Sequence, residues 1–122
     1  MEGGSKVNEN RFITISKHQL QHGGYVYEVV DTESGIVYLQ NIRYHQTQSP
    51  ALAWATLCKR DGNVISVSDE VINALKQLVV DLGYKANGGS GETSWSLLEV
   101  SQQNNCSKKA IKLIETWYTN RM

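Results

Sequence analysis

Hydrophobic and polar residues alternate along the first half of the chain, which is the pattern of β-strands. Residues 11–16 form a short alternating run, and residues 25–30 form a longer one that is rich in aromatic and β-branched side chains. Residues 35–40 and 51–59 repeat the pattern, and residues 64–67 add a further apolar run. Because successive side chains of a strand point to opposite faces, each run can bury one face. The pattern predicts four or five antiparallel strands.

Two turn sequences are expected to join these strands into hairpins. Residues 31–35 (DTESG) place an Asp carboxylate where it can accept hydrogen bonds from backbone amides ahead of it, and Gly35 tolerates a positive φ angle. Asp61 and Gly62 predict a type I′ turn, because both residue types tolerate positive φ. We therefore expect a β-meander over residues 11–67.

The second half of the chain changes to a helical periodicity. Ser68 is a predicted N-cap and Gly83 a predicted C-terminal cap. The apolar stripe between them consists of Val71, Leu75, Leu78 and Leu82. A short helix is expected after Thr93 or Ser94, and a last helix after Ser107. The prediction is an α+β fold in which two to three helices pack on the antiparallel sheet.

The chain length and the absence of repeats predict a single domain over residues 1–122. Residues 1–10 are polar and are expected to be flexible. Residues 11–67 form the predicted meander and residues 68–122 the helical half. A glycine-rich loop at residues 87–91 is interpreted as an internal connection.

Composition narrows the classes of function. The chain has 12 basic and 12 acidic residues, so its formal net charge is zero, and strong non-specific nucleic-acid binding normally leaves a basic excess. No apolar run approaches the roughly 20 residues of a membrane-spanning helix, and the first ten residues lack the apolar region of a signal peptide. We expect a cytoplasmic protein without membrane contact, in which Cys58 and Cys106 are reduced thiols.

One resemblance gives a biological setting. Residues 31–39 (DTESGIVYL), followed by residues 57–64 (LCKRDGNV), resemble the hairpins of short uncharacterised domains that are often encoded by phages and prophages. The resemblance covers about a third of the chain. It implies a small accessory or inhibitory protein of a mobile element that binds a host or phage component. It carries over no catalytic residue.

Residues 99–115 have the spacing of a helix-turn-helix, with Asn105 at the turn position that favours a left-handed backbone. The candidate nucleic-acid contacts at the start of the second helix are Lys108, Lys109 and Lys112. Against DNA binding, the chain is neutral, and Asn104 is polar where the motif prefers an apolar residue. Two packed helices with a tight turn explain the same pattern, so both interpretations stay open.

Candidate catalytic and ligand sites are sparse. His18 and His22 have the i, i+4 spacing of metal ligands only if that stretch is helical, and His45 lies elsewhere. The glycine loop could offer backbone amides to an anion through Gly88, Gly89 and Gly91, but it lacks the lysine of a P-loop. We expect no catalytic residue, no metal and no cofactor.

The aromatic content suggests an interface. The chain has three Trp and six Tyr but one Phe, and rings with a polar edge suit surfaces that stay partly wet. The residues predicted to bind a partner are Trp95, Trp117, Tyr118 and Tyr44. Alternatively, rings beside Arg43, Lys59 or Arg60 could hold a nucleotide.

Three hypotheses follow from the sequence. The preferred one is a non-enzymatic binding protein that acts through protein contact as a homodimer. The second is a small DNA-binding regulator that uses residues 99–115. The third is a nucleotide- or small-molecule-binding protein.

Overall fold

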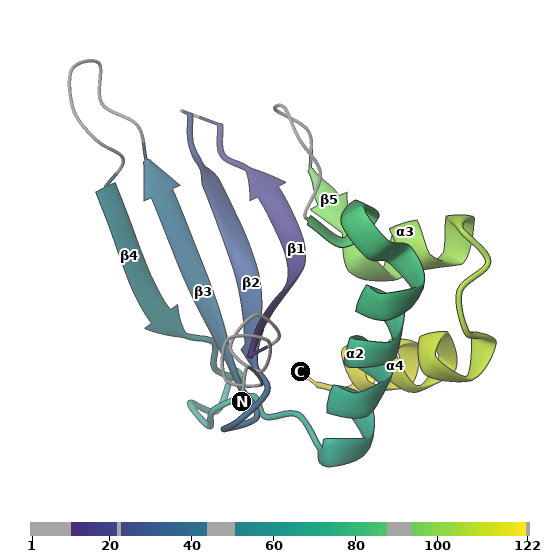
Figure 1. The fold of residues 1–122 in the computed structure, drawn as a ribbon. Coiled ribbons are helices and arrows are strands. Elements are labelled where there is room, and N and C mark those ends of the chain that lie inside the picture. Colours follow the sequence, from purple (N-terminus) through teal and green to yellow (C-terminus); the bar gives the residue numbers. More distant parts are fainter. Residues whose placement is uncertain (1–10, 22, 44–50, 88–93, 122) are drawn as a thin grey trace, which may run out of the picture.

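Five strands and three α-helices make up the described part of the chain, which covers residues 11–21, 23–43, 51–87 and 94–121 of a computed structural model. The helices lie together on one side of an antiparallel sheet (Figure 1). The predicted α+β fold, with the β-meander first and the helices after it, is confirmed. Within the described residues, no helix combines the length and apolar character needed to cross a membrane.

The sheet contains a strand that the sequence did not predict. Its strands are β1 (Phe12–Gln19), β2 (Tyr25–Asp31), β3 (Ile36–Arg43), β4 (Ala51–Thr56) and β5 (Trp95–Ser96), in the order β4-β3-β2-β1-β5. The short strand β5 comes from the helical half and pairs with β1 through Ser16 opposite Ser96. Residues 64–67, which were expected to form a strand, make only isolated bridges from Val64 and Ser66 to the meander. The strand β5 therefore lies beside β1, whereas the predicted fifth strand at residues 64–67 would lie beside β4.

The helices begin where serine side chains cap them. The elements are α2 (Asp69–Leu82), the 3₁₀ helix η1 (Gly83–Asn87), α3 (Leu97–Gln103) and α4 (Lys108–Asn120). The predicted caps are confirmed, because Ser68 accepts a hydrogen bond from the Val71 amide and Ser107 accepts one from the Ala110 amide. The expectation of Thr93 or Ser94 as the cap of the short helix was wrong. Ser96, which also ends β5, caps α3, because its side chain accepts a hydrogen bond from the Glu99 amide.

The hydrophobic core lies between the sheet and the helices. Its members with least exposure are Val30, Val37, Ile65, Leu75, Leu78 and Leu97, each 1% exposed or less. The predicted stripe of α2 faces this core, because Val71, Leu75, Leu78 and Leu82 are all buried. The core extends to α4 through Ala110 and Ile114. Cys106 is buried in it, and both cysteines are free thiols, as expected.

The turn at Asp61 differs from the predicted type I′ turn. Gly62 has φ +89°, whereas Asp61 is not among the described residues with positive φ. The Gly62 amide donates to the Lys59 carbonyl at 3.0 Å, and the Lys59 amide donates to the Asn63 carbonyl at 2.7 Å. This is the three-residue hairpin loop in which one left-handed glycine follows an ordinary turn. Only one residue then needs positive φ, so Asp61 avoids that strain.

The turn before β3 brings the backbone of Gly35 close to the backbone of Val67. Gly35 has φ +75°, as predicted, and its carbonyl accepts a hydrogen bond from the Val67 amide at 2.7 Å. A Cβ atom at position 35 would lie 2.8 Å from the Val67 carbonyl oxygen, whereas one at Gly62 would meet nothing within 4 Å. Two separate constraints therefore require glycine at position 35.

We predict that Gly35→Ala destabilises the protein much more than Gly62→Ala. Both substitutions impose a left-handed backbone on alanine, at a cost of roughly 1–2 kcal/mol. Gly35→Ala adds the clash with Val67, which raises its expected cost to about 3 kcal/mol. Urea unfolding of the two variants measures the difference. Equal losses of unfolding free energy would contradict the close approach at Val67.

Candidate interaction surface

The register of the sheet separates a covered face from an open one. Ile13, Val30 and Val37 lie opposite one another on β1, β2 and β3 and all belong to the core beneath the helices. Side chains alternate along a strand, so their chain neighbours point to the other face. Val29 and Tyr38, which are paired, lie on that other face. Within the described residues, all the core residues of the helices pack on the first face, so we call the second the open face.

Three aromatic side chains meet on the open face. The ring centroids of Phe12 and Trp54 are 6.2 Å apart, with an interplanar angle of 65°. Those of Tyr38 and Trp54 are 6.0 Å apart, at 74°. These edge-to-face geometries are favourable for aromatic pairs. We call Phe12, Tyr38 and Trp54 the aromatic cluster, and it joins β1, β3 and the edge strand β4.

The aromatic cluster is exposed although it is large and apolar. Phe12 is 47% exposed and Trp54 is 50% exposed, while Tyr38 is half-buried. Single exposed apolar side chains are ordinary, whereas large contiguous patches of them are typical of interaction sites. Phe12, Tyr38 and Trp54 are not among the four residues predicted to bind a partner. Alternation along β4 sets Trp54 on one face of the strand, but nothing in the local pattern shows whether that face is covered.

The charges beside the aromatic cluster cancel one another. The Arg11 guanidinium lies 4.9 Å from the centre of the Phe12 ring. It also donates to both carboxylate oxygens of Asp31, at 3.0 Å and 3.1 Å, and its third nitrogen lies 3.4 Å from Glu33. Hydrogen bonding to Arg11, aided by the Glu33 amide, lowers the pKa of the Asp31 carboxyl from 3.8 to about 2. Arg11, the cation that contacts the Phe12 ring, is thus paired with two acidic residues.

More rings follow along the same face. Tyr25 and Tyr27 alternate with Val26 on β2, so they share the open face with Val29. Their ring centroids are 6.3 Å apart, and the Lys17 ammonium lies 4.8 Å from the centre of the Tyr25 ring. Both tyrosines are half-buried, so the exposed part of this aromatic face is concentrated at Phe12 and Trp54.

Three of the four residues predicted to bind a partner are described, and they lie in the helical half of the chain. Trp95 and Trp117 are half-buried against the core, and the Trp117 indole donates to the Ser66 carbonyl at 3.1 Å. Tyr118 is 37% exposed, and its hydroxyl donates to the Glu28 carboxylate at 3.3 Å. The structure brings Trp117 and Tyr118 into edge contact, with ring centroids 5.9 Å apart. Tyr44 lies outside the described residues, and the role of all four in binding stays a prediction.

Tyr118 belongs to a cluster that fastens α4 to the sheet. Arg121 donates to Glu28 of β2 at 2.9 Å, and its guanidinium lies 3.9 Å from the centre of the Tyr118 ring. Burial, together with the Glu28 charge, raises the pKa of the Tyr118 hydroxyl. Glu28 is 8% exposed, so this ion pair is largely shielded from water. These contacts give Tyr118 a structural role, because they hold the end of α4 against β2.

Helices α3 and α4 have the predicted turn between them. Asn105 has φ +56°, which confirms the left-handed position, and Ser101 of α3 is fully buried. The Asn104 side chain donates to the Val100 carbonyl at 2.7 Å and closes the end of α3. The three candidate contacts, Lys108, Lys109 and Lys112, are exposed on α4. The geometry therefore fits a helix-turn-helix, although packing alone also accounts for it.

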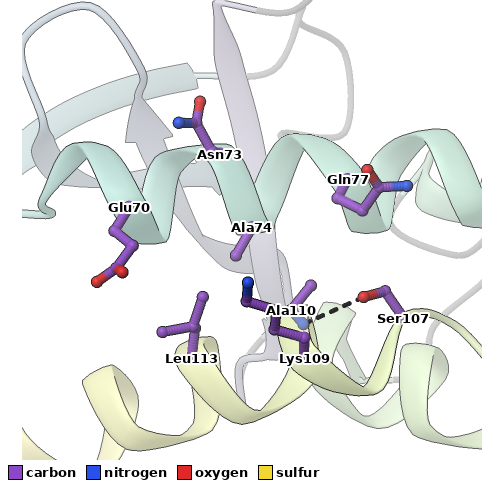
Figure 2. Close-up of a pocket in the computed structure, with 8 residues that line it drawn as sticks. All are labelled: Glu70, Asn73, Ala74, Gln77, Ser107, Lys109, Ala110 and Leu113. Atoms are coloured by element: carbon purple, nitrogen blue, oxygen red, sulfur yellow. Dashed lines mark hydrogen bonds between the residues drawn. The ribbon is translucent and has the colours of Figure 1, made fainter.

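A shallow groove of about 340 Å³ lies between α2 and α4 (Figure 2). Glu70, Asn73, Ala74 and Gln77 line it from α2, and Ala110, Lys109, Leu113 and Ser107 line it from the other side. The Ser107 hydroxyl at the groove accepts a hydrogen bond from the Ala110 amide at 3.2 Å, which is its role as the N-cap of α4 (Figure 2).

Among the described residues, the remaining candidate ligand residues do not come together as a site. His18 is exposed on β1, while His22, His45 and the glycines at 88, 89 and 91 lie outside the described residues. Lys59 and Arg60 are exposed in the hairpin turn. In the part of the chain that the structure describes, no group of three or more His, Cys, Asp or Glu is placed to hold a metal ion.

Comparison with known proteins adds no assignment. A scan against protein-family models and searches of curated proteins and of solved structures gave no match.

We predict that the Arg11–Asp31 pair contributes stability that is lost in acid. A carboxyl whose folded pKa is lowered stabilises the fold above its ordinary value, and the contribution falls as pH drops from about 4 to about 2. Asp31→Asn should therefore be less stable than the wild type near neutral pH and approach it near pH 2. Thermal unfolding across this range measures the convergence.

Asp61→Asn is the matched control, because Asp61 also accepts from the backbone amide two residues ahead but forms no ion pair with a described residue. It should leave the acid dependence close to that of the wild type. A constant gap between Asp31→Asn and the wild type at all pH values would contradict the role of the ion pair.

Proposed function

We propose that the protein is a non-enzymatic protein-binding domain whose partner docks on the aromatic cluster of Phe12, Tyr38 and Trp54. The observation that carries this proposal is the exposure of Phe12 and Trp54, at 47% and 50%, in edge contact on the open face. Aromatic residues dominate the binding energy of protein interfaces when they fill a pocket of the partner. The cluster offers such anchors on a rigid sheet.

The charge around the cluster favours a partner with apolar side chains. Arg11, which lies over the Phe12 ring, is held by Asp31 and Glu33, so this cation is already paired with carboxylates. Stacking of nucleic-acid bases on aromatic residues is normally combined with a basic groove. An uncharged protein surface that inserts an aliphatic or aromatic side chain beside Trp54 matches this face better than a nucleic acid does.

The biological setting remains as the resemblance implies. Residues 31–39, which carry it, form the turn and the strand that place Tyr38 in the cluster. An accessory or inhibitory factor of a phage or mobile element in the cytoplasm would act by holding a host or phage protein. The aromatic cluster supplies the surface for that contact.

We predict that Trp54→Ala weakens partner binding by about thirtyfold, which corresponds to the loss of roughly 2 kcal/mol at an interface anchor. Phe12→Ala should weaken it in the same direction. Proteins captured from host lysate by the wild type and the variants are compared quantitatively by mass spectrometry. The affinity of a purified captured protein is then measured by calorimetry.

Tyr84→Ala is the matched control, since Tyr84 is 80% exposed on η1 and makes no ring contact with the cluster. It should bind like the wild type, and circular dichroism confirms that all variants are folded. Equal capture by Trp54→Ala and the wild type would overturn the assignment of the cluster.

DNA binding by α3 and α4 is the second candidate. The left-handed Asn105 and the buried small residue Ser101 favour it, because a helix-turn-helix needs both a tight turn and a close helix approach. The neutral chain and Glu115, which accepts from Gln102 on the same helix pair at 3.4 Å, weigh against it.

If α4 contacts phosphates, the double variant Lys108→Gln with Lys112→Gln should weaken DNA retention and lower the salt slope by about one for each lost phosphate contact. Lys76→Gln, which removes an exposed charge from α2, should change neither quantity. Filter binding over a salt series measures both. No retention by the wild type, or the same loss with Lys76→Gln, would exclude this role.

A further inference from the structure

The strand β4 forms an open edge of the sheet. Its one neighbour among the described strands is β3, and it lies on the side away from the helices (Figure 1). The Leu57 amide just beyond β4 donates to the Val37 carbonyl of β3 at 2.9 Å. Backbone groups alternate in direction along an antiparallel strand, so Ala53 and Ala55 also point to β3. The amides and carbonyls of Leu52, Trp54 and Thr56 therefore point outward.

Within β4 and the other described residues, this edge lacks the features that usually prevent strand pairing. The sequence of β4, ALAWAT, contains no charged residue and no proline. Its register with β3 runs without a bulge from Tyr38 opposite Thr56 to Arg43 opposite Ala51. Soluble proteins normally blunt such an edge with charges, proline, a bulge or a covering element. The other edge, β5, is protected because it is two residues long.

We infer that β4 pairs antiparallel with β4 of a second copy of this chain, across a two-fold axis at Trp54. Outward-pointing residues pair only with outward-pointing residues. An axis at Trp54 sets Trp54 opposite its own copy and Leu52 opposite Thr56 of the second copy. This register pairs all three outward-pointing residues of each strand. With an axis at Ala53, Thr56 would instead fall opposite position 50 of the second copy, which is outside β4.

The exposed ring of Trp54 favours a second copy as the occupant. Residues directly opposite in an antiparallel pair share a face, so the two Trp54 side chains become neighbours on the open face. One contact then covers both the outward backbone of β4 and part of a tryptophan that is 50% exposed. A peptide that merely added a strand would satisfy the backbone without necessarily covering the ring.

Charge and edge length also fit a closed pair of chains. β4 is uncharged, so pairing with its antiparallel copy sets no like charges of the two strands against each other. Because pairing uses the long edge of each chain, only the short β5 edges remain. The association therefore ends at a dimer and does not continue into a fibre.

The dimer goes beyond the proposed function but shares Trp54 with it. The dimer pairs the backbone edge of β4, whereas the partner docks on the aromatic cluster. The two readouts are kept apart by residues that belong to one surface only: Phe12 on β1 tests partner binding, and Thr56, which is outside the aromatic cluster, tests the dimer.

The test compares Thr56→Pro with Thr56→Ala by light scattering after gel filtration, over a dilution series. The wild type should have twice the 13.7 kDa mass of one chain. Thr56→Pro removes an outward amide without touching the bonds to β3, and an edge strand tolerates proline there. It should raise the dimer dissociation constant about tenfold or more, since two symmetry-related hydrogen bonds are lost. Thr56→Ala keeps the amide and should remain dimeric.

Amide hydrogen exchange of the wild type provides a second measurement that needs no variant. The Trp54 and Thr56 amides should exchange more slowly as concentration rises, while the Ala55 amide, which points to β3, should not respond to dimer formation. A monomeric wild type, dimers of equal strength in both Thr56 variants, or fast exchange of Trp54 and Thr56 at every concentration would each overturn the proposal.

Discussion

The Asp31 carboxylate at the end of β2 accepts hydrogen bonds from the Glu33 amide, the Ser34 hydroxyl and the Arg11 guanidinium. It is 5% exposed, and a buried carboxylate is tolerated only when its oxygens are satisfied in this way. The first two bonds shape the turn that brings Gly35 against Val67, and the third fixes the residue before Phe12. The order of β1, β2 and β3 at this end of the sheet, and the place of Phe12 on the open face, depend on it.

The distribution of helices explains why the sheet has two unequal surfaces. α2 and α4 bury the face that carries Val30 and Val37, and α3 reaches the same core through Leu97. With the helices gathered beside β1 and β5, no described element is left to cover the open face or the β4 edge (Figure 1). An antiparallel sheet can leave one face to water when that face is polar. Here the exposed residues Phe12 and Trp54 are aromatic, so the face is not the polar surface that water favours. Both proposals give these exposed rings a binding partner.

Local features of the fold could be predicted because their causes are local. Ser68 and Ser107 cap helices through their own side chains, and Asn105 takes a left-handed turn that few residues tolerate. β5 could not be predicted, since Trp95 and Ser96 become a strand only by pairing with β1, almost eighty residues earlier in the chain. The turn at Asp61 was assigned the wrong type because Asp-Gly serves both two- and three-residue loops.

The candidate site was harder to predict than the fold, for a related reason. Trp54 and Trp117 are the same residue type in regular elements, and only tertiary structure shows that Trp117 packs on the core while Trp54 meets Phe12 in the open. Exposure depends on which face lacks helices, and strand order decides which strand is the edge. Neither property is encoded in a short window of sequence.

The edge and the open face have a joint consequence for recognition. If β4 pairs with its copy at Trp54, the two aromatic clusters meet across the two-fold axis on one continuous sheet. A monomeric partner then finds two equivalent sites side by side, whereas a dimeric or repetitive partner can engage both at once. Once the first site is bound, the second contact forms within the same complex. The overall affinity then rises because the sheet keeps the second site at a high effective concentration, without any new contact. A small domain with one modest aromatic cluster would in this way bind a symmetric or repeating target far more tightly than a single copy of it.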